Sequence, residues 1–123
     1  MDKDALIHEL GALIVGNPKV AAASWDRYAL VVRIDSGQSK LHGFAHTNGN
    51  YQPVTPTGFA LHDTLAKLRA ATHIEGKDPW GACVIRIDRS SGKIRVEFEY
   101  DAPERWTVTP QNAQQIAERA LPV

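Results

Sequence analysis

The stretch from residue 79 to residue 101, PWGACVIRIDRSSGKIRVEFEYD, contains two runs of alternating side chains separated by a polar turn. In the first run Cys83, Ile85 and Ile87 share one parity, with Val84, Arg86 and Asp88 at the other. In the second run the apolar side chains share one parity: Ile94, Val96, Phe98 and Tyr100. The charged side chains of the second run lie at the other parity: Arg95, Glu97, Glu99 and Asp101. A period of two over this length predicts a β-hairpin with one buried face. Gly92 can supply the positive φ that the hairpin loop needs.

An N-terminal helix is predicted over residues 3–15. Its apolar side chains recur at helical spacing: Leu6, Ile7, Leu10, Leu13 and Ile14. Asp2 or Asp4 can cap the first turn. The helix ends before Pro18, because proline cannot donate the next helical hydrogen bond.

A second antiparallel hairpin is predicted between this helix and the central stretch. Trp25 opens its first strand, which has one apolar parity: Tyr28, Leu30, Val32 and Ile34. Residues 35–38 turn the chain, and residues 40–45 return as a second strand. Residues 46–57 are rich in proline, glycine and polar side chains, which predicts a loop with a short edge strand around Tyr51.

Two further helices complete the predicted order. The first covers residues 58–72 and carries a stripe of Leu61, Leu65 and Leu68. The second starts at Thr109-Pro110 and ends at Pro122, with a thinner apolar stripe: Ala113, Ile116, Ala117, Ala120 and Leu121. The order α-β-β-α-β-β-α predicts a single α+β domain over residues 1–123, an antiparallel sheet of four to five strands with helices packed on it.

Composition limits the possible functions. The chain has 14 basic and 14 acidic residues, so no global charge attracts it to nucleic acid or an anionic membrane. Its single cysteine, Cys83, lies in an apolar run and is predicted to be an inert buried thiol. The first ten residues, MDKDALIHEL, do not resemble a signal peptide, and no apolar run reaches transmembrane length. We therefore expect a cytoplasmic protein.

No catalytic constellation emerges from the sequence. His42 and His46 are four residues apart on a predicted strand, which places them about 13 Å from each other, too far to share one metal ion. We interpret them as a surface pair. Nucleophile-elbow and phosphate-loop motifs are absent from the sequence. We therefore expect no enzyme activity, no cofactor and no metal site.

The three tryptophans lie at predicted strand ends. Trp25 and Trp80 are interpreted as caps of the core. Trp106 lies in the polar, proline-flanked segment APERWT and is the best candidate for an exposed anchor, because large aromatic side chains dominate interface energetics.

The chain resembles the YezG-like antitoxin and immunity-protein family. The matching features are the N-terminal helix, Trp25 at a strand start, the leucines Leu65 and Leu68, the pair Pro79-Trp80, and Gly92-Lys93 followed by VEFEYD. The resemblance covers nearly the whole chain by order of elements, although residues 41–46 are less aromatic than in the family.

The resemblance implies a small cytoplasmic protein that binds and neutralises a cognate toxin domain, often a nuclease, by stoichiometric occlusion. It implies a protein partner, with no direct contact to nucleic acid or membrane, and a monomer or weak homodimer. An acidic strand face suits a basic nuclease cleft. The predicted contact residues, which would mimic phosphates, are Glu97, Glu99, Asp101 and Glu104, with Trp106 adjacent.

Two other interpretations stay open. In the first, the chain is a small-molecule-binding or enzyme-accessory domain, with His42, Phe44 and His46 lining a pocket on the sheet. In the second, the chain associates with itself through the apolar outer side of the first strand, at Ala29 and Val31.

Overall fold

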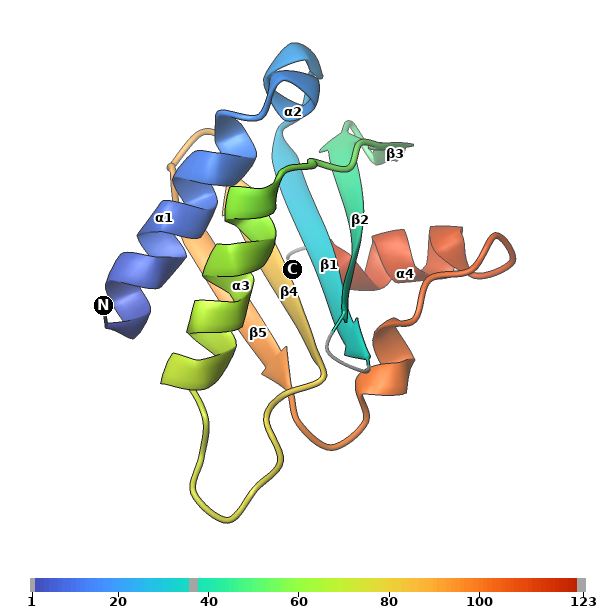
Figure 1. Cartoon of the computed structure of the whole chain (residues 1–123). Coiled ribbons are helices and arrows are strands. Elements are labelled where there is room, and N and C mark those ends of the chain that lie inside the picture. Colours follow the sequence, from blue (N-terminus) through green and yellow to red (C-terminus); the bar gives the residue numbers. More distant parts are fainter. Residues whose placement is uncertain (1, 36–37, 122–123) are drawn as a thin grey trace.

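The computed structural model describes residues 2–35 and 38–121 and shows a layered α+β fold (Figure 1). In chain order the elements are α1 (Lys3–Val15), α2 (Pro18–Ala22), β1 (Arg27–Asp35), β2 (Gln38–Thr47), β3 (Asn50–Pro53), α3 (Phe59–Ala71), β4 (Ala82–Asp88), β5 (Ile94–Glu99), the 3-10 helix η1 (Pro103–Trp106) and α4 (Ala113–Ala120). The strands form a 5-stranded antiparallel sheet in the order β3-β2-β1-β4-β5. The predicted α+β class is confirmed, as is the short edge strand around Tyr51.

The local signals at α1 act as predicted. The Asp2 side chain accepts a hydrogen bond of 2.8 Å from the backbone N–H of Ala5 and so caps the first turn. At the other end, the N–H of Gly16 donates to the carbonyl of Ala12 at 2.9 Å, and the helix ends before Pro18. The sequence of this segment therefore sets both helix ends.

The sequence pattern does not predict α2 or η1, and it places the start of α4 too early. Pro18 begins α2 as well as ending α1, because Asn17 accepts from the N–H of Lys19 at 3.0 Å. Before α4, the N–H of Thr109 donates to the Asn112 side chain at 2.7 Å, and this local turn delays the helix to Ala113. The predicted turn residues Ser36 and Gly37, and the predicted stop at Pro122, lie outside the described residues.

The central hairpin forms as predicted. β4 and β5 pair with Ala82 opposite Glu99 and Ile87 opposite Ile94. In the loop, the Asp88 carboxylate accepts from the N–H of Ser90 at 2.9 Å and from its hydroxyl at 2.7 Å. Gly92 has φ +70°, which confirms the expected need for glycine.

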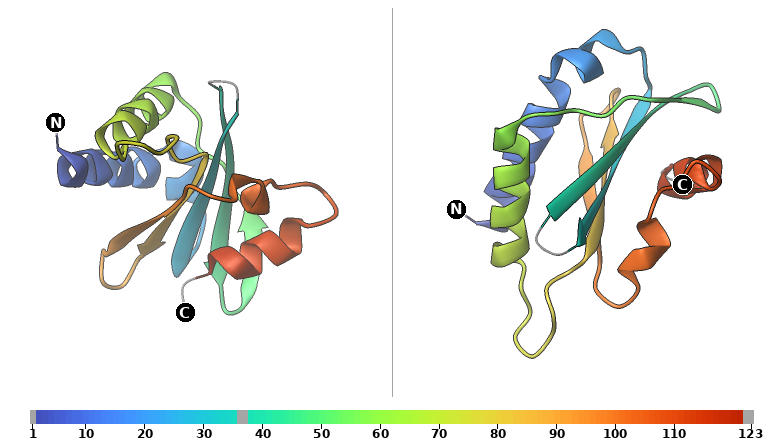
Figure 2. Two further views of the ribbon diagram at one scale, coloured as in Figure 1. Left: turned by 90° about the horizontal axis from the view of Figure 1, so that it is seen from below. Right: turned by 45° about the vertical axis from the view of Figure 1, so that its right-hand side comes forward.

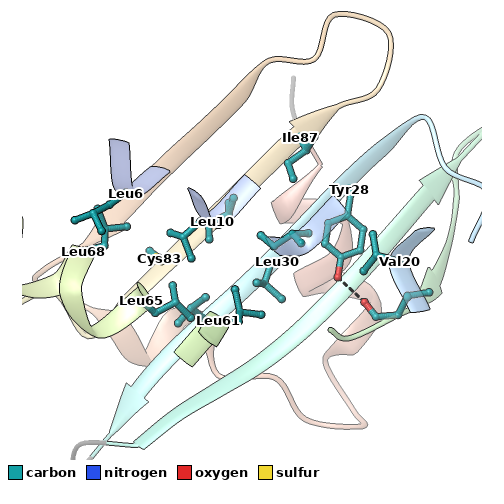
Figure 3. Packing of buried hydrophobic residues seen from close by; sticks show 14 of the residues in the cluster. Leu6, Leu10, Val20, Tyr28, Leu30, Leu61, Leu65, Leu68, Cys83 and Ile87 are labelled. Atoms are coloured by element: carbon teal, nitrogen blue, oxygen red, sulfur yellow. Dashed lines mark hydrogen bonds between the residues drawn. The ribbon is translucent and has the colours of Figure 1, made fainter. Parts of the chain in front are cut away.

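One face of the sheet packs against α1 and α3 and holds the larger core (Figure 3). Its fully buried members include Leu6, Leu10, Tyr28, Leu30, Leu65, Leu68, Cys83 and Ile85. Burial raises the pKa of the Cys83 thiol, so this side chain stays protonated and behaves as the inert apolar residue that we expected. Trp25 and Trp80 are also buried at the edges of this core, as predicted.

The opposite face of the sheet is also covered, by η1 and α4 (Figure 2). The second core contains Ala29, Val31, Phe44, Ala82, Val84, Trp106, Ile116, Ala117 and Ala120. The expectation of one buried face is therefore wrong for the central strands, since β1 and β4 are buried on both sides. The proposed self-association through Ala29 and Val31 is also wrong, because these side chains are 0% and 1% exposed beneath the C-terminal segment.

Among the described residues, no helix combines the length and the apolar character that crossing a membrane requires.

Gly43 permits a close approach between β2 and the segment that follows β3. The Tyr28 hydroxyl donates a buried hydrogen bond to the carbonyl of Val54, directly over Gly43. A Cβ atom at position 43 would overlap both the Val54 carbonyl oxygen and the Tyr28 hydroxyl. Since the Val54 oxygen belongs to the backbone, the strand cannot relieve this overlap by changing a rotamer.

We expect Gly43→Ala to lower the free energy of unfolding by about 2–4 kcal/mol, because the added methyl displaces a buried hydrogen bond and its strand. Urea denaturation at constant m-value measures the change. Tyr28→Phe is the matched control, since it removes the same hydrogen bond without adding volume and should cost about 1–3 kcal/mol. An alanine variant as stable as the wild type would contradict the close packing described for this position.

Candidate protein-binding surface

The predicted contact residues lie at the end of β5 and on η1, which together form one corner of the molecule. On β5, Glu97 and Glu99 point to the sheet face that η1 and α4 cover, because they pair with Val84 and Ala82 of the second core. The corner is therefore built where the sheet meets the C-terminal segment, and this decides which acidic groups are available.

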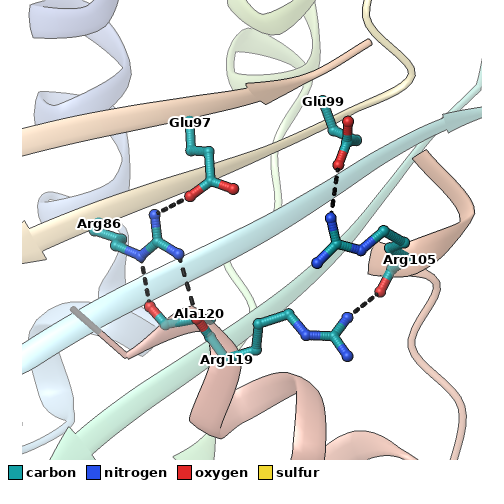
Figure 4. Close-up of polar contacts among 6 residues, drawn as sticks. All are labelled: Arg86, Glu97, Glu99, Arg105, Arg119 and Ala120. Carbon is teal, nitrogen blue, oxygen red and sulfur yellow. Dashed lines mark hydrogen bonds and ion pairs between the residues drawn. The ribbon is translucent and has the colours of Figure 1, made fainter. Parts of the chain in front are cut away.

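Glu97 forms an ion pair with Arg86 inside this junction (Figure 4). The Arg86 Nη1 donates to the Glu97 carboxylate at 2.9 Å. The same guanidinium donates from Nε to the carbonyl of Ala120 at 2.8 Å and from Nη2 to the carbonyl of Arg119 at 3.3 Å. These carbonyls belong to the last turn of α4, where no further helical N–H group is available to donate to them. The negative end of the helix dipole also lies there. Arg86 therefore anchors the end of α4 to the sheet, and Glu97 holds Arg86 in place.

Glu99 is tied into the start of η1 in a similar way. Its carboxylate lies 3.5 Å from Nη1 of Arg105 and accepts a bond of 3.4 Å from the backbone N–H of Ala102. The Glu99 side chain is only 17% exposed. Arg119 on α4 donates to the carbonyl of Arg105 at 2.7 Å, so α4 and η1 are also joined to each other. Glu99 therefore fixes the chain as it leaves β5 and has little surface left for a partner.

Trp106 is not the exposed anchor that the sequence pattern suggested. Its side chain is 2% exposed and belongs to the second core, with the Arg119 guanidinium 5.5 Å from its ring. The physical reason is η1, which turns the chain back over the sheet immediately after β5. The sequence does contain a signal for the burial of Trp106. Both parities of the central strands are apolar, so a second segment of the chain must pack on the face opposite α1 and α3.

Asp101, Glu104 and Glu97 are the predicted contact residues that stay exposed, and of these Glu97 is engaged by Arg86. Asp101 and Glu104 flank the turn between β5 and η1, on either side of the half-buried Ala102 and Pro103. Glu97 adds partial negative charge nearby, since its side chain is 52% exposed despite the ion pair with Arg86. We call Asp101 and Glu104 the acidic corner.

The small-molecule interpretation predicts that His42, Phe44 and His46 line a pocket. They do share the sheet face of α4, but Phe44 and His46 are buried in contact with the rest of the fold. The ring of Tyr51 packs edge-on against Phe44, with centroids 5.5 Å apart. The expected surface pair of histidines is therefore wrong for His46, which is 6% exposed, whereas His42 is half-buried.

His46 is held between β2 and α4. Its Nε2 lies 2.9 Å from the carbonyl of Ala117, so this nitrogen carries the proton and donates. Its Nδ1 is buried and makes no hydrogen bond. Burial lowers the pKa of His46, and the positive charge of Arg27 lowers it further, while the carbonyls of Ala117 and Phe44 oppose the shift. Burial also lowers the pKa of His42, with Lys40 adding to the effect.

In the described part of the chain, no cleft brings His42, Phe44 and His46 together: a cleft of about 270 Å³ includes His46, with Asp26, Arg27, Thr47, Asn48, Gly49 and Leu121, but neither His42 nor Phe44. A cleft of about 440 Å³ opens on the other face, between α3 and the ends of β1 and β2, and is lined by Ile34, Ser39, Ala66, Arg69, Ala70, His73 and Pro79. Within residues 2–35 and 38–121, no group of three or more His, Cys, Asp and Glu side chains is arranged to hold a metal ion.

No protein-family model matches the chain, and a search of curated protein sequences finds no match to it. The resemblance to YezG-like proteins therefore stays a prediction from the quoted residues.

We expect Arg86→Ala to lower the free energy of unfolding by about 2–3 kcal/mol, because it leaves two α4 carbonyls and Glu97 without their partner. Hydrogen exchange should accelerate in α4 more than in α1. The matched control is Lys40→Ala, which removes an exposed basic side chain from β2 and should change stability by less than about 0.5 kcal/mol. Equal effects of the two variants would show that Arg86 does not anchor α4.

We also expect stability to fall as the pH is lowered from about 7.5 to about 5.5. The pKa of His46 is lower in the folded state than the ordinary value of 6.5, so the unfolded chain binds the proton first and is favoured by acid. His46→Gln keeps a donor for the Ala117 carbonyl and should flatten this dependence, with His42 supplying the remainder. Thermal midpoints measured across the range test this, and parallel curves for the two proteins would contradict it.

Proposed function

We propose that this chain is an immunity protein, which acts in the cytoplasm by binding a cognate toxin domain in a stoichiometric complex without turnover. The resemblance to YezG-like proteins supports the class of partner. The single structural observation that carries the proposal is the acidic corner, which presents two exposed carboxylates on a fixed turn.

The charge of the corner suits a basic partner such as a nuclease. The active cleft of a nuclease must attract phosphates, so it carries positive potential, and opposite potentials on two proteins speed their encounter and fix their orientation. Asp101 and Glu104 can take the place of phosphates in such a cleft. Glu97 contributes through its exposed part, while Glu99 and Trp106 act from below as supports of the corner.

The anchoring of the corner favours tight binding. Its backbone is held by the bond from the N–H of Arg105 to the carbonyl of Ala102, 3.1 Å, and by Glu99. The buried ring of Trp106 fixes the far end of η1. A surface that is already ordered loses little conformational entropy on binding, so more of its contact energy appears as affinity.

The test begins with the isolation of the partner. The tagged protein is used to capture a partner from its native cell, and the captured toxin-like domain is then purified and assayed alone. Titration of this chain should abolish the toxin activity at a ratio of one to one. A partner whose activity is unchanged at saturation would refute the immunity proposal.

The double variant Asp101→Lys/Glu104→Lys should reduce affinity for the toxin at least tenfold, because each lysine faces the positive cleft that the carboxylate matched. Glu97 and Glu99 are left intact, since replacing them would disturb the Arg86 and Arg105 ion pairs. The control is Asp26→Lys, an exposed carboxylate at the opposite end of the sheet. Calorimetric titration gives both affinities, and an unchanged affinity of the double variant would exclude the acidic corner as the contact.

Small-molecule binding is the second candidate function, and the cleft beside α3 is the observation that favours it. Its volume of about 440 Å³ lies in the range of ligand pockets. Arg69 lines it and also donates to the carbonyl of Trp80 at 2.8 Å, which fixes its guanidinium. A thermal-shift screen in which an anionic compound stabilises the wild type but not Arg69→Ala would support this function.

A further inference from the structure

β5 forms an open edge of the sheet. It is the last strand in the order β3-β2-β1-β4-β5, and Figure 2 shows it at the outer side of the sheet. The other edge strand, β3, has only 4 residues and ends in Pro53, which cannot donate a hydrogen bond. β5 has 6 residues, contains no proline, and pairs with no second strand in the described part of the chain.

The backbone of β5 directs alternate residues outward. The N–H of Asp88 donates to the carbonyl of Lys93 at 3.0 Å, so Lys93 faces β4. In an antiparallel ladder the direction alternates, so Arg95 and Glu97 also face β4, while Ile94, Val96 and Phe98 direct their N–H and C=O groups toward the open side. The edge therefore offers a set of donors and acceptors to another strand.

The charges along this edge are ordered in an unusual way. From Lys93 to Glu99 the sequence reads KIRVEFE, with two positive residues before Val96 and two negative residues after it. Charged side chains on an edge strand commonly prevent pairing. In this strand the order is antisymmetric about Val96, so an antiparallel copy of the strand carries the complementary charges.

We propose that two copies of this chain pair through β5, antiparallel, with Val96 on the two-fold axis, to form one continuous sheet. This register places Arg95 opposite Glu97 of the second copy, whose side chain is 52% exposed, and this contact occurs twice. It also brings Lys93 opposite Glu99 of the second copy, whose carboxylate is already engaged by Arg105 and Ala102 and therefore contributes less. It places Ile94 opposite Phe98 of the second copy on the other face. The pairing is isologous, as expected for a homodimer.

The backbone and the charges select the same register. With outward-facing groups on Ile94, Val96 and Phe98, the pairing can shift only in steps that keep these residues opposite one another. One shift places Arg95 opposite its own copy, and the opposite shift does the same for Glu97. Like charges directly opposite each other destabilise a sheet, so the register centred on Val96 is favoured because it has none.

Apolar surface along the same edge gives the pairing a hydrophobic contribution. The row Ile94, Val96, Phe98 and Tyr100 packs against the larger core but is only half-buried. Beside its hairpin end, α1 and the hairpin form a groove of about 450 Å³ that is lined by Asp4, Ile7, His8, Gly92, Lys93 and Ile94. A second strand along β5 would cover more of this row.

Sedimentation over a concentration series of the purified chain tests the proposal. The wild type should show a reversible monomer–dimer equilibrium that high salt weakens. Arg95→Glu should raise the dissociation constant at least tenfold, because it places carboxylates opposite each other twice. The control Lys19→Glu makes the same charge change on the exposed surface of α2 and should leave the equilibrium unchanged. A wild type that stays monomeric at every concentration, or a dimer insensitive to Arg95→Glu, would overturn the proposal.

A charge-exchange experiment tests whether the pairing is specific. Glu97→Arg alone should also stay monomeric, since it places arginines opposite each other. An equimolar mixture of Arg95→Glu and Glu97→Arg should form heterodimers, because every cross-strand pair is then of opposite charge. Melting curves check that Glu97→Arg, which loses the Arg86 ion pair, is folded. Failure of the folded variants to associate would argue against this register.

Disulfide trapping tests the register independently of charge. Residues 95 and 97 of opposite copies form a non-hydrogen-bonded pair, with Cα atoms about 4.5 Å apart, which suits a disulfide. Arg95→Cys mixed with Glu97→Cys should cross-link on mild oxidation, whereas either variant alone should not. The buried Cys83 does not compete. Cross-linking of one variant with itself would place the axis at that residue instead.

The dimer proposal and the immunity proposal can fail independently of each other. If the monomeric Arg95→Glu variant still inhibits the toxin, then inhibition does not require the dimer.

Discussion

The fold depends on the burial of β1 and β4 on both faces. One face receives α1 and α3 over a broad core around Tyr28, Leu30 and Ile85. The other face is equally apolar at Ala29, Val31 and Val84, so it cannot be left in water. The chain meets this constraint with its C-terminal segment, which turns at η1 and lays α4 across the sheet. The enclosure of Glu99 at the end of β5 follows from this fold-back, because Ala102 and Arg105, which engage its carboxylate, belong to the returning segment.

Arg86 and Glu99 hold the C-terminal segment in place by polar contacts at its two ends. Arg86 binds the last carbonyls of α4, and Glu99 binds the backbone at the entry to η1. Carboxylates on the second face of β5 are therefore partly used inside the molecule. Charge alternation in the sequence predicts a partner-binding face, but in the structure these charges first join the sheet to the C-terminal segment. Asp101 and Glu104, which lie beyond the strand, are exposed.

The two proposed contact surfaces are neighbours but use different groups. The acidic corner lies beyond the last residue of β5, whereas self-pairing would use the strand from Lys93 to Glu99 and its outward backbone. In an antiparallel dimer the two corners lie at opposite ends of the paired strands. Each copy could therefore bind its own toxin domain while the sheet is shared.

Local chemistry in the sequence was sufficient for most of the elements. The apolar period of 3.6 and the Asp2 cap define α1, and the period of two with Gly92 defines the central hairpin, because these signals act between residues close in the chain. The α+β class follows from the order of these elements. The burial of Trp25, Trp80 and Cys83 could also be inferred, since each adjoins an apolar run.

The burial of Trp106 and His46 is determined only by the tertiary structure. Trp106 lies in a polar segment, and nothing within that segment shows that η1 turns it onto Val31 and Val84. His46 is buried beneath α4, and its hydrogen-bond partner, the carbonyl of Ala117, lies 71 residues further along the chain. The ion pairs of Glu97 and Glu99 also could not be predicted from the sequence. Their arginine partners become clear only from the strand register and from the fold-back of the C-terminal segment. Sequence periodicity reports which side chains seek burial, whereas the partners that cover them are set by long-range packing.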